Sequence, residues 1–386
     1  MALNQFAKVL QLFDTVILKR SGLSVGEIVT ANIGLLCTEK SDFVAIENHR
    51  NDGFYADALG ISDSLAASIL RIQMDARAQQ IIPLPEHLSV NLLKAVNAPI
   101  SPMACGLVAC DIDVFTQHNS RTKKDGVSRT YAGTDGYAPI AVLVRWDSGF
   151  HAAHLSHQIE ATSIARQAAG GEPIHFLVKG NPRRMDIQAL HAQRIESQAI
   201  ACLPGDGKRV WVWETAEKNC LAQQELKHCR IQRLIERAID AKGQALLTPE
   251  LEYEFWDTTL PAHFNPAEVI QLYQDHGTHE QFHGEFKTDL DLERLPSGKF
   301  DINDCVLFLA GVAYNVLRLI GQLALLGEDA PVRHTAKRRR LKTVIQEMIC
   351  VSAKVDTYAR SVILNFGRHC LAIVVFERLY GQWSAA

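Results

Sequence analysis

The spacing of hydrophobic residues predicts a helical region at the start of the chain. Apolar side chains recur there at the three- and four-residue intervals of an amphipathic helix, at Leu10, Phe13, Val16, Ile17, Leu23, Val25 and Ile28. Gly53 and Gly60 interrupt the segment, and Pro83 and Pro85 mark its end. We therefore expect residues 1–85 to form a small helical domain that is followed by a linker.

Continuous apolar runs after this domain predict buried strands. They occupy residues 106–114, 137–147 and 174–179. Asp111 and Asp113 lie near the end of the first run, and Asp147 ends the second. The polar, Gly-rich stretch 121–136 between these two runs predicts a loop or a hairpin.

A β-rich segment and a second helical region follow along the chain. Residues 209–213 alternate between polar and apolar side chains as in a strand, and residues 246–255 predict another, so we expect 185–262 to be β-rich. Asn265-Pro266-Ala-Glu268 then combines a helix cap, a first-turn proline and an acid three residues after the cap. After Lys299 we expect helices to the end of the chain.

The composition is that of a soluble globular protein, with 47% hydrophobic and 22% charged residues. The longest apolar run, Cys305–Leu326, contains Asn315, Arg318 and Gln322, which favours a packed helix over a membrane span. The first residues show no signal-peptide pattern, and none of the nine cysteines has the spacing of a zinc knuckle or a redox motif. We expect a cytoplasmic protein of two or three domains.

Charge is distributed unevenly along the chain, although the net charge is only −3. Residues 331–386 contain ten Lys or Arg and three Asp or Glu, about +7, which leaves about −10 for the rest. This asymmetry permits binding of a polyanion such as nucleic acid by the C-terminal region. A solvated basic helix face explains the same charge equally well.

A polar stripe on the helix that begins near Pro266 provides candidate chemistry. Tyr273, His276, Glu280 and Lys287 are separated by three, four and seven residues, which places them on one helical face. Carboxylates from two strands and this helix would form an all-oxygen site suited to two Mg²⁺ or Mn²⁺ ions. Such a pair can activate the attacking hydroxyl and stabilise the leaving oxygen in phosphodiester chemistry.

The same stripe resembles a known signature. Tyr273-Gln-Asp-His276-Gly-Thr-His-Glu280-Gln-Phe-His-Gly-Glu-Phe-Lys287 is similar to the pattern of insertion-sequence DDE transposases, namely Tyr, two residues, Arg, three residues, Glu, six residues and Lys. His276 stands where the family has Arg, which makes a phosphate contact there weaker or pH-dependent. Further segments resemble the insertion-sequence-1380 group of the insertion-sequence-4-like superfamily, at residues 130–139, 145–149, 179–184, 288–300, 338–345 and 367–370.

The resemblance implies an α/β fold with a ribonuclease H-like catalytic core, flanked by helical N- and C-terminal regions. The implied division is as follows: 1–85, a helical domain that binds DNA ends or simply caps the fold; 100–184 and 263–300, the core; 185–262, the β-rich insertion; 301–386, the helical C-terminal region. It further implies metal-dependent hydrolysis of the phosphodiester at transposon ends and strand transfer to target DNA, by a homodimer on double-stranded DNA.

Carried over by position, the catalytic and metal-binding acids are Asp113, Asp147 and Glu280. Asp111 is an alternative to Asp113 as the first acid, because both lie on one face of the same strand. The resemblance also implies that three residues contact DNA phosphates, at Tyr273, His276 and Lys287. The clusters 183–184 and 337–340 could hold the DNA backbone or be solvated, and we expect His151, His154 and His157 to be ordinary helix residues.

The interval between the first two acids is short for such a core. Only 33 residues separate Asp113 from Asp147, whereas two strands, a helix and their turns need roughly forty. We therefore expect that a strand and a helix are deleted and that the run 137–147 joins the start of one strand to another. Asp186 is an alternative second acid in a differently arranged core. Besides an active transposase, the sequence allows a catalytically impaired DNA-binding remnant, or a nuclease without joining activity.

Overall fold

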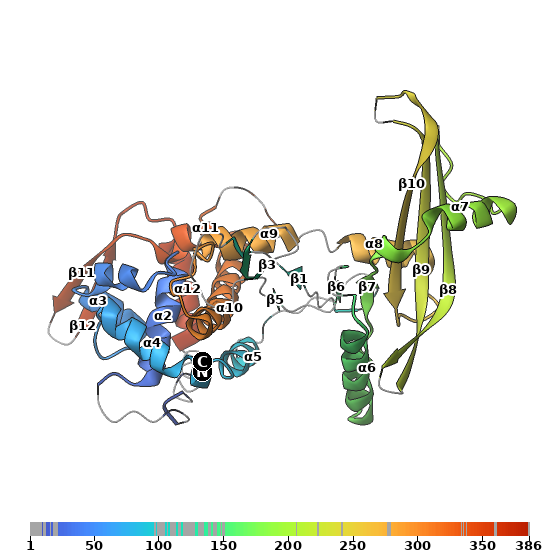
Figure 1. Ribbon diagram of the computed structural model, residues 1–386. Coiled ribbons are helices and arrows are strands. Elements are labelled where there is room, and N and C mark those ends of the chain that lie inside the picture. The colour runs from blue at the N-terminus through green and yellow to red at the C-terminus, as the bar shows by residue number, and fades with distance from the viewer. Residues whose placement is uncertain are drawn as a thin grey trace. The chain divides into compact units, whose positions relative to one another are not determined.

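The computed structural model describes most of the chain in two compact units (Figure 1). The described residues are 10, 13–15, 17, 22–95, 98, 105, 107–108, 113–114, 117–118, 128–129, 135–137, 140–141, 145–146, 148, 151–205, 207–221, 224–240, 242–275, 279–332, 334, 336, 338–358 and 361–384. Unit 1 comprises Met1–Ile100, Thr116–Pro139 and Glu280–Ala386, and unit 2 comprises Ser101–Phe115 and Ile140–His279. The chain therefore passes between the units four times.

Unit 1 is mainly helical, as the N-terminal pattern predicts. Ser24 caps its first long helix in a capping box with Glu27, so that two backbone N–H groups at the helix start are satisfied. The elements are α2 (Val25–Cys37), η1 (Phe43–His49), α3 (Gly53–Leu59), α4 (Ala67–Ile81), α5 (Pro85–Ala95), α9 (His279–Gly284), η5 (Glu285–Asp289), α10 (Phe300–Ala324), α11 (Leu341–Val344), η6 (Ile345–Ile349) and α12 (Ile373–Ser384).

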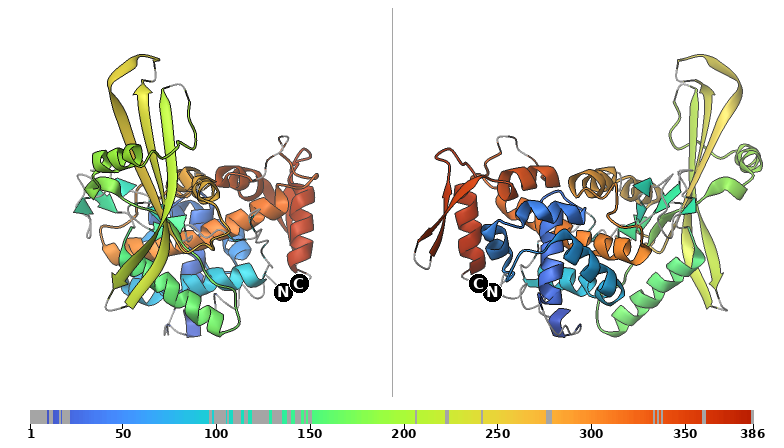
Figure 2. Two further views of the ribbon diagram at one scale, coloured as in Figure 1. Left: turned by 90° about the vertical axis from the view of Figure 1, so that its right-hand side faces the viewer. Right: turned by 60° about the vertical axis from the view of Figure 1, so that its left-hand side comes forward.

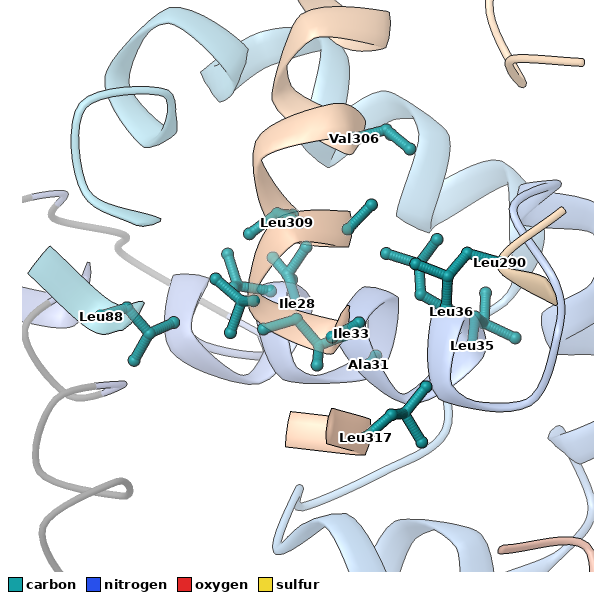
Figure 3. Close-up of a cluster of buried hydrophobic side chains, with 14 of the residues drawn as sticks. Ile28, Ala31, Ile33, Leu35, Leu36, Leu88, Leu290, Val306, Leu309 and Leu317 are labelled. Carbon is teal, nitrogen blue, oxygen red and sulfur yellow. The ribbon is translucent and has the colours of Figure 1, made fainter. Parts of the chain in front are cut away.

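Helix α10 forms the centre of the unit 1 core, against α2, α4, α5 and α11. Leu309 of α10 lies beside Ile28 and Ile33 of α2, and Val306 lies further along α10 (Figure 3). Helix α10 is long and apolar enough to cross a membrane, but this packing is that of a core helix, as its polar residues predict. The N- and C-terminal helical regions thus share one core, and Pro85 begins α5 instead of a linker.

Two small elements differ from the expected all-helical C-terminal region. Strands β11 (Ala353–Tyr358) and β12 (Ser361–Phe366) form an antiparallel hairpin, so the expectation of helices alone after Lys299 is wrong. Val355 stands between the charged Lys354 and Asp356, as in an alternating strand, and β12 contains the β-branched Val362 and Ile363. These residues give both segments strand propensity that outweighs the helical context.

The large sheet of unit 2 has the order β6-β7-β10-β9-β8. Its strands are β6 (Arg145–Trp146), β7 (Leu177–Lys179), β8 (Lys208–Leu221), β9 (Gln224–Ile239) and β10 (Ala245–Thr258). Strands β6 and β7 are parallel and are joined through α6 (Ala153–Ala168), whereas the other neighbours are antiparallel. Strands β8 to β10 occupy the range expected to be β-rich, and Figure 2 shows them in green to yellow from two further directions.

Helices cover both faces of this sheet because successive side chains of a strand point to opposite sides. Phe176 and Val178 pack against α6, whereas Leu177 and Trp256 pack against α8 (Pro266–Gln274). Two short helical elements, η3 (Pro182–Arg184) and α7 (Ile187–Glu196), connect β7 to β8. The mixture of helices and sheets agrees with the expected α/β class.

The smaller sheets lie in the range of the short interval between the first two acids. Strand β1 (Asp113–Val114) pairs antiparallel with β5 (Ile140–Ala141). Strands β2 (Gln117–His118), β4 (Asp135–Tyr137) and β3 (Ser128–Arg129) form a separate sheet in that order, so the Gly-rich stretch contains a hairpin. The apolar run 137–147 is therefore divided among the end of β4, β5 and β6, which belong to three different sheets.

Candidate active site

Two of the three acids carried over by position lie at the start of described secondary-structure elements. Asp113 begins β1, where its Cα is paired with that of Ala141. Glu280 is the second residue of α9. The side chains of both residues lie outside the described part of the structure, as do Asp147, which directly follows β6, and Asp111. The convergence of these acids stays a prediction.

The alternative second acid, Asp186, has a local structural role. It is the N-cap residue of α7, and its Oδ1 accepts a hydrogen bond of 3.0 Å from the backbone N–H of Ala189. A carboxylate in this position satisfies one of the free N–H groups at a helix start. The position of Asp186 therefore has a structural explanation that involves no metal.

The signature is divided between two helices instead of lying on one. Helix α8 begins as predicted: Asn265 Oδ1 accepts from the backbone N–H of Glu268 at 3.0 Å, and the Glu268 carboxylate accepts from the backbone N–H of Asn265 at 2.9 Å. The helix ends at Gln274, and α9 begins at His279. His276 lies outside the described residues.

Tyr273 belongs to α8 and packs on the sheet. Its ring centroid lies 6.0 Å from that of Trp256, whose side chain is buried in the unit 2 core. The ring of this signature residue therefore helps to fix α8 on strand β10, whatever its hydroxyl contacts.

Lys287 lies on a π-helical turn, η5, that continues directly from α9. The backbone N–H of Leu290 donates to the carbonyl of Glu285, five residues earlier, at 3.0 Å. A π-turn contains more residues per turn than an α-helix, so it rotates Lys287 away from the position that regular helical spacing from Glu280 predicts. Single π-turns of this kind are frequent at functional sites.

The same turn carries two buried carboxylates that the sequence did not single out. Asp289 is 0% exposed and Glu285 only 1%. Arg340 donates to Asp289 through two nitrogens, from Nη2 to Oδ1 at 2.7 Å and from Nε to Oδ2 at 2.8 Å. The backbone N–H of Lys342 also donates to Asp289 Oδ2, at 3.1 Å.

Glu285 has an equally complete set of partners. Arg338 forms an ion pair with its carboxylate. The backbone N–H of Leu341 donates to Oε1 at 3.1 Å, and the Tyr314 hydroxyl donates to Oε2 at 3.2 Å. Burial raises the pKa of Tyr314 to about 12, and the charge of Glu285 adds to that increase.

The basic run near the C-terminus is therefore engaged within the protein. Between Arg338 and Arg340, the buried Arg339 donates from Nε to the carbonyl of Leu325 at 2.8 Å. Arg340 keeps 55% of its side chain exposed, but its guanidinium faces a buried carboxylate. All three arginines therefore have partners within the protein, a role that neither alternative for this run, a solvated face or a DNA-binding patch, includes.

Unit 2 contains a second buried acidic centre, at Asp257 near the end of β10. Arg230 donates to it through Nε at 2.7 Å and Nη2 at 2.9 Å, and His151 Nε2 lies 2.9 Å from Oδ2. His228 Nε2 is 3.5 Å from Oδ1, which is too far for a hydrogen bond. Burial would raise the pKa of Asp257, but these three cationic or polar side chains hold it well below its ordinary value.

This centre corrects the expectation that His151 is a helix residue, and it bears on whether the described residues could hold a metal ion. His151 precedes α6 and bonds to Asp257, so it is not a helix residue. His151, His228 and Asp257 line a cavity of about 40 Å³, large enough for a water molecule. Within the described residues, no group of three or more His, Cys, Asp or Glu side chains is arranged to hold a metal ion.

Comparison with known families finds a match in the C-terminal part of the chain. Residues 230–384 match the family model described as Transposase DDE domain group 1. The match supports a DDE transposase, and it covers Glu280 with both arginine-bound carboxylates, whereas Asp113 and Asp147 precede it. No curated protein matches the chain.

Proposed function

We propose that this chain is a DNA transposase of the DDE type, from the insertion-sequence-1380 group of the insertion-sequence-4-like superfamily. The observation that carries the proposal is the family match over 230–384, because this range contains the Tyr273 to Lys287 signature. The reaction is hydrolysis of the phosphodiester at a transposon end, followed by transfer of the freed 3′ hydroxyl to target DNA. The chain acts as a homodimer on DNA in the cytoplasm.

Asp113, Asp147 and Glu280 form a donor set that fits two Mg²⁺ or Mn²⁺ ions, because all three supply carboxylate oxygens. Bound ions would supply activation of the attacking oxygen and stabilisation of the leaving oxygen. Lys287, with His276 and the Tyr273 hydroxyl, binds backbone phosphates of the transposon end. Lys287 contributes a point charge, which neutralises a phosphate without reading its sequence.

A second candidate is a catalytically impaired remnant that binds transposon ends without cutting them. The pairing of β5 with β1 and of β6 with β7 favours it, because only three residues separate β5 from β6. Among the described strands, β1 and β6 lie in different sheets, so the strand that begins with Asp113 is not paired with the strand that precedes Asp147. A deletion within the run 137–147 that joined the start of one strand to the end of another would leave β5 and β6 close in sequence but in separate sheets.

Cleavage of a labelled duplex that carries a transposon end distinguishes the two candidates. We expect Mg²⁺-dependent nicking by the wild-type chain and a loss of at least about a thousandfold in Glu280→Gln, since this change removes a metal-binding carboxylate while keeping its shape. End binding without nicking in the wild-type chain would refute the active transposase and support the remnant. Nicking without any joined product would identify a plain nuclease instead.

A further inference from the structure

Two carboxylates of the η5 turn hold the helix that carries Glu280. We propose that Arg338 and Arg340 are positioning residues, which fix α9 and η5 through Glu285 and Asp289 and do not bind DNA. We call these four residues the arginine clamp. The inference rests on the proposed function, because the orientation of Glu280 matters only if Glu280 binds metal.

The location of the clamp relative to Glu280 is the first argument. Glu285 and Asp289 follow Glu280 by five and nine residues in one uninterrupted helical stretch. Lys287 lies between them, so the backbone on both sides of Lys287 is fixed. The backbone N–H of Glu293 also donates to the Lys287 carbonyl, at 3.2 Å. A helix fixed at these points has little freedom to rotate, and active-site geometry tolerates only about half an ångström of error.

The burial of the two carboxylates is the second argument. A charge that is fully removed from water is stable only when it is paired and its oxygens are hydrogen-bonded. Both oxygens of Asp289 accept hydrogen bonds, from the Arg340 guanidinium and the backbone of Lys342. Removal of Arg340 would leave a buried carboxylate with a single backbone donor, and η5 would have to shift to hydrate it.

The geometry of the arginines is the third argument. Arg340 presents a two-pronged fork to Asp289, an arrangement that lysine does not reproduce. Hydrogen bonding to Asp289 raises the pKa of Arg340, so the protonated, donating form is favoured further. A DNA phosphate could take these donors only if a carboxylate that is 0% exposed gave them up. The two donors of Arg340 that face Asp289 therefore serve the catalytic helix and not the DNA surface.

Arg340→Gln and Asp289→Asn test the clamp, because they change the net charge in opposite directions but break the same pair. Arg368→Gln is the matched control, since Arg368 is an exposed arginine of the same C-terminal region. We expect amide hydrogen exchange over residues 279–290 to become about tenfold faster in both clamp variants and to stay unchanged in the control. Wild-type exchange rates in the clamp variants would overturn the proposal.

Binding of the end duplex without Mg²⁺ provides the second arm. If Arg340 contacts a phosphate, Arg340→Gln weakens binding and lowers the salt slope by about one, whereas Asp289→Asn does not. The clamp predicts that both variants behave alike. Opposite changes in affinity would therefore overturn the proposal.

The Mg²⁺ dependence of cleavage tests whether the clamp positions Glu280, because loss of stability alone would not change the Mg²⁺ concentration that the folded protein needs. We expect the Mg²⁺ concentration for half-maximal cleavage to rise about tenfold in both clamp variants, and Arg340→Lys to restore part of it. A rise in neither variant would overturn the positioning role. If the wild-type chain does not cleave, the proposed function fails, and the exchange and binding arms still decide whether the clamp exists. If Arg340→Gln does not fold, amide hydrogen exchange is measured on Arg340→Lys instead.

Discussion

Replacement of Asp257 by Asn should destabilise unit 2 by removing the counter-charge of Arg230. Asp257 is 7% exposed and receives two hydrogen bonds from Arg230 and one from His151. Breaking one partner of a fully buried pair costs about 3–5 kcal/mol. Arg230 is 21% exposed, and Glu217 lies 4.0 Å from it, so solvent and this second acid reduce the cost. We expect a loss of about 2–3 kcal/mol at neutral pH.

The same acid predicts how stability depends on pH. The pKa of Asp257 is lowered in the folded state from the ordinary value of 3.8. A carboxyl with a depressed folded pKa stabilises the protein above its unfolded pKa, and this stabilisation is lost as pH falls toward the folded pKa. Wild-type unit 2 should therefore lose stability from about pH 4 downward, and Asp257→Asn should show a flatter acid limb.

Urea unfolding followed by tryptophan fluorescence measures both effects. Four of the five tryptophans belong to unit 2, so the signal reports mainly on this unit: Trp146, Trp211, Trp213 and Trp256. Glu217→Gln is a suitable control, because it removes a nearby charge that makes no hydrogen bond to Arg230. An Asp257→Asn variant within about 0.5 kcal/mol of wild type, or with the same acid limb, would refute the reasoning.

Two further substitutions test packing in the two units. Gly180→Ala should destabilise unit 2 by about 1–3 kcal/mol, because the added Cβ would lie 1.9 Å from the buried ring of Phe255. Gly205→Ala is the control, because a Cβ added at Gly205 meets no atom within 4 Å. Equal urea midpoints for the two variants would contradict the prediction that Gly180 packs against Phe255. Asn32→Leu should stabilise unit 1 by about 1 kcal/mol, because this buried amide has no hydrogen-bond partner in the described structure. A lower midpoint by circular dichroism would show that the amide is needed.

Local patterns made much of the fold predictable. The helix start at Asn265 was recognisable because the cap, the proline and Glu268 lie within four residues and satisfy each other's backbone groups. The α10 core helix was recognisable because polar residues interrupt its apolar run. Both predictions depended on interactions between near neighbours in the sequence.

Long-range pairings explain what the sequence did not reveal. Arg338 and Glu285 are 53 positions apart in the sequence, and His151 and Asp257 are 106 positions apart. Neither pair has a local signal, since an isolated carboxylate or histidine looks like any surface residue until the fold buries it. The break of the signature helix after Gln274 had no local signal either, because Gly277 alone is tolerated inside helices.

The four passages of the chain between the units have a consequence for how the protein can be divided. Neither unit is a continuous stretch of sequence, so no single truncation yields one unit alone. A cut between His279 and Glu280 would leave unit 2 whole but separate unit 1 into two fragments, which bury one core between α2 and α10. These fragments should reassociate when they are mixed, so that co-expression of 1–279 with 280–386 offers a split protein whose assembly is controlled by supplying either part.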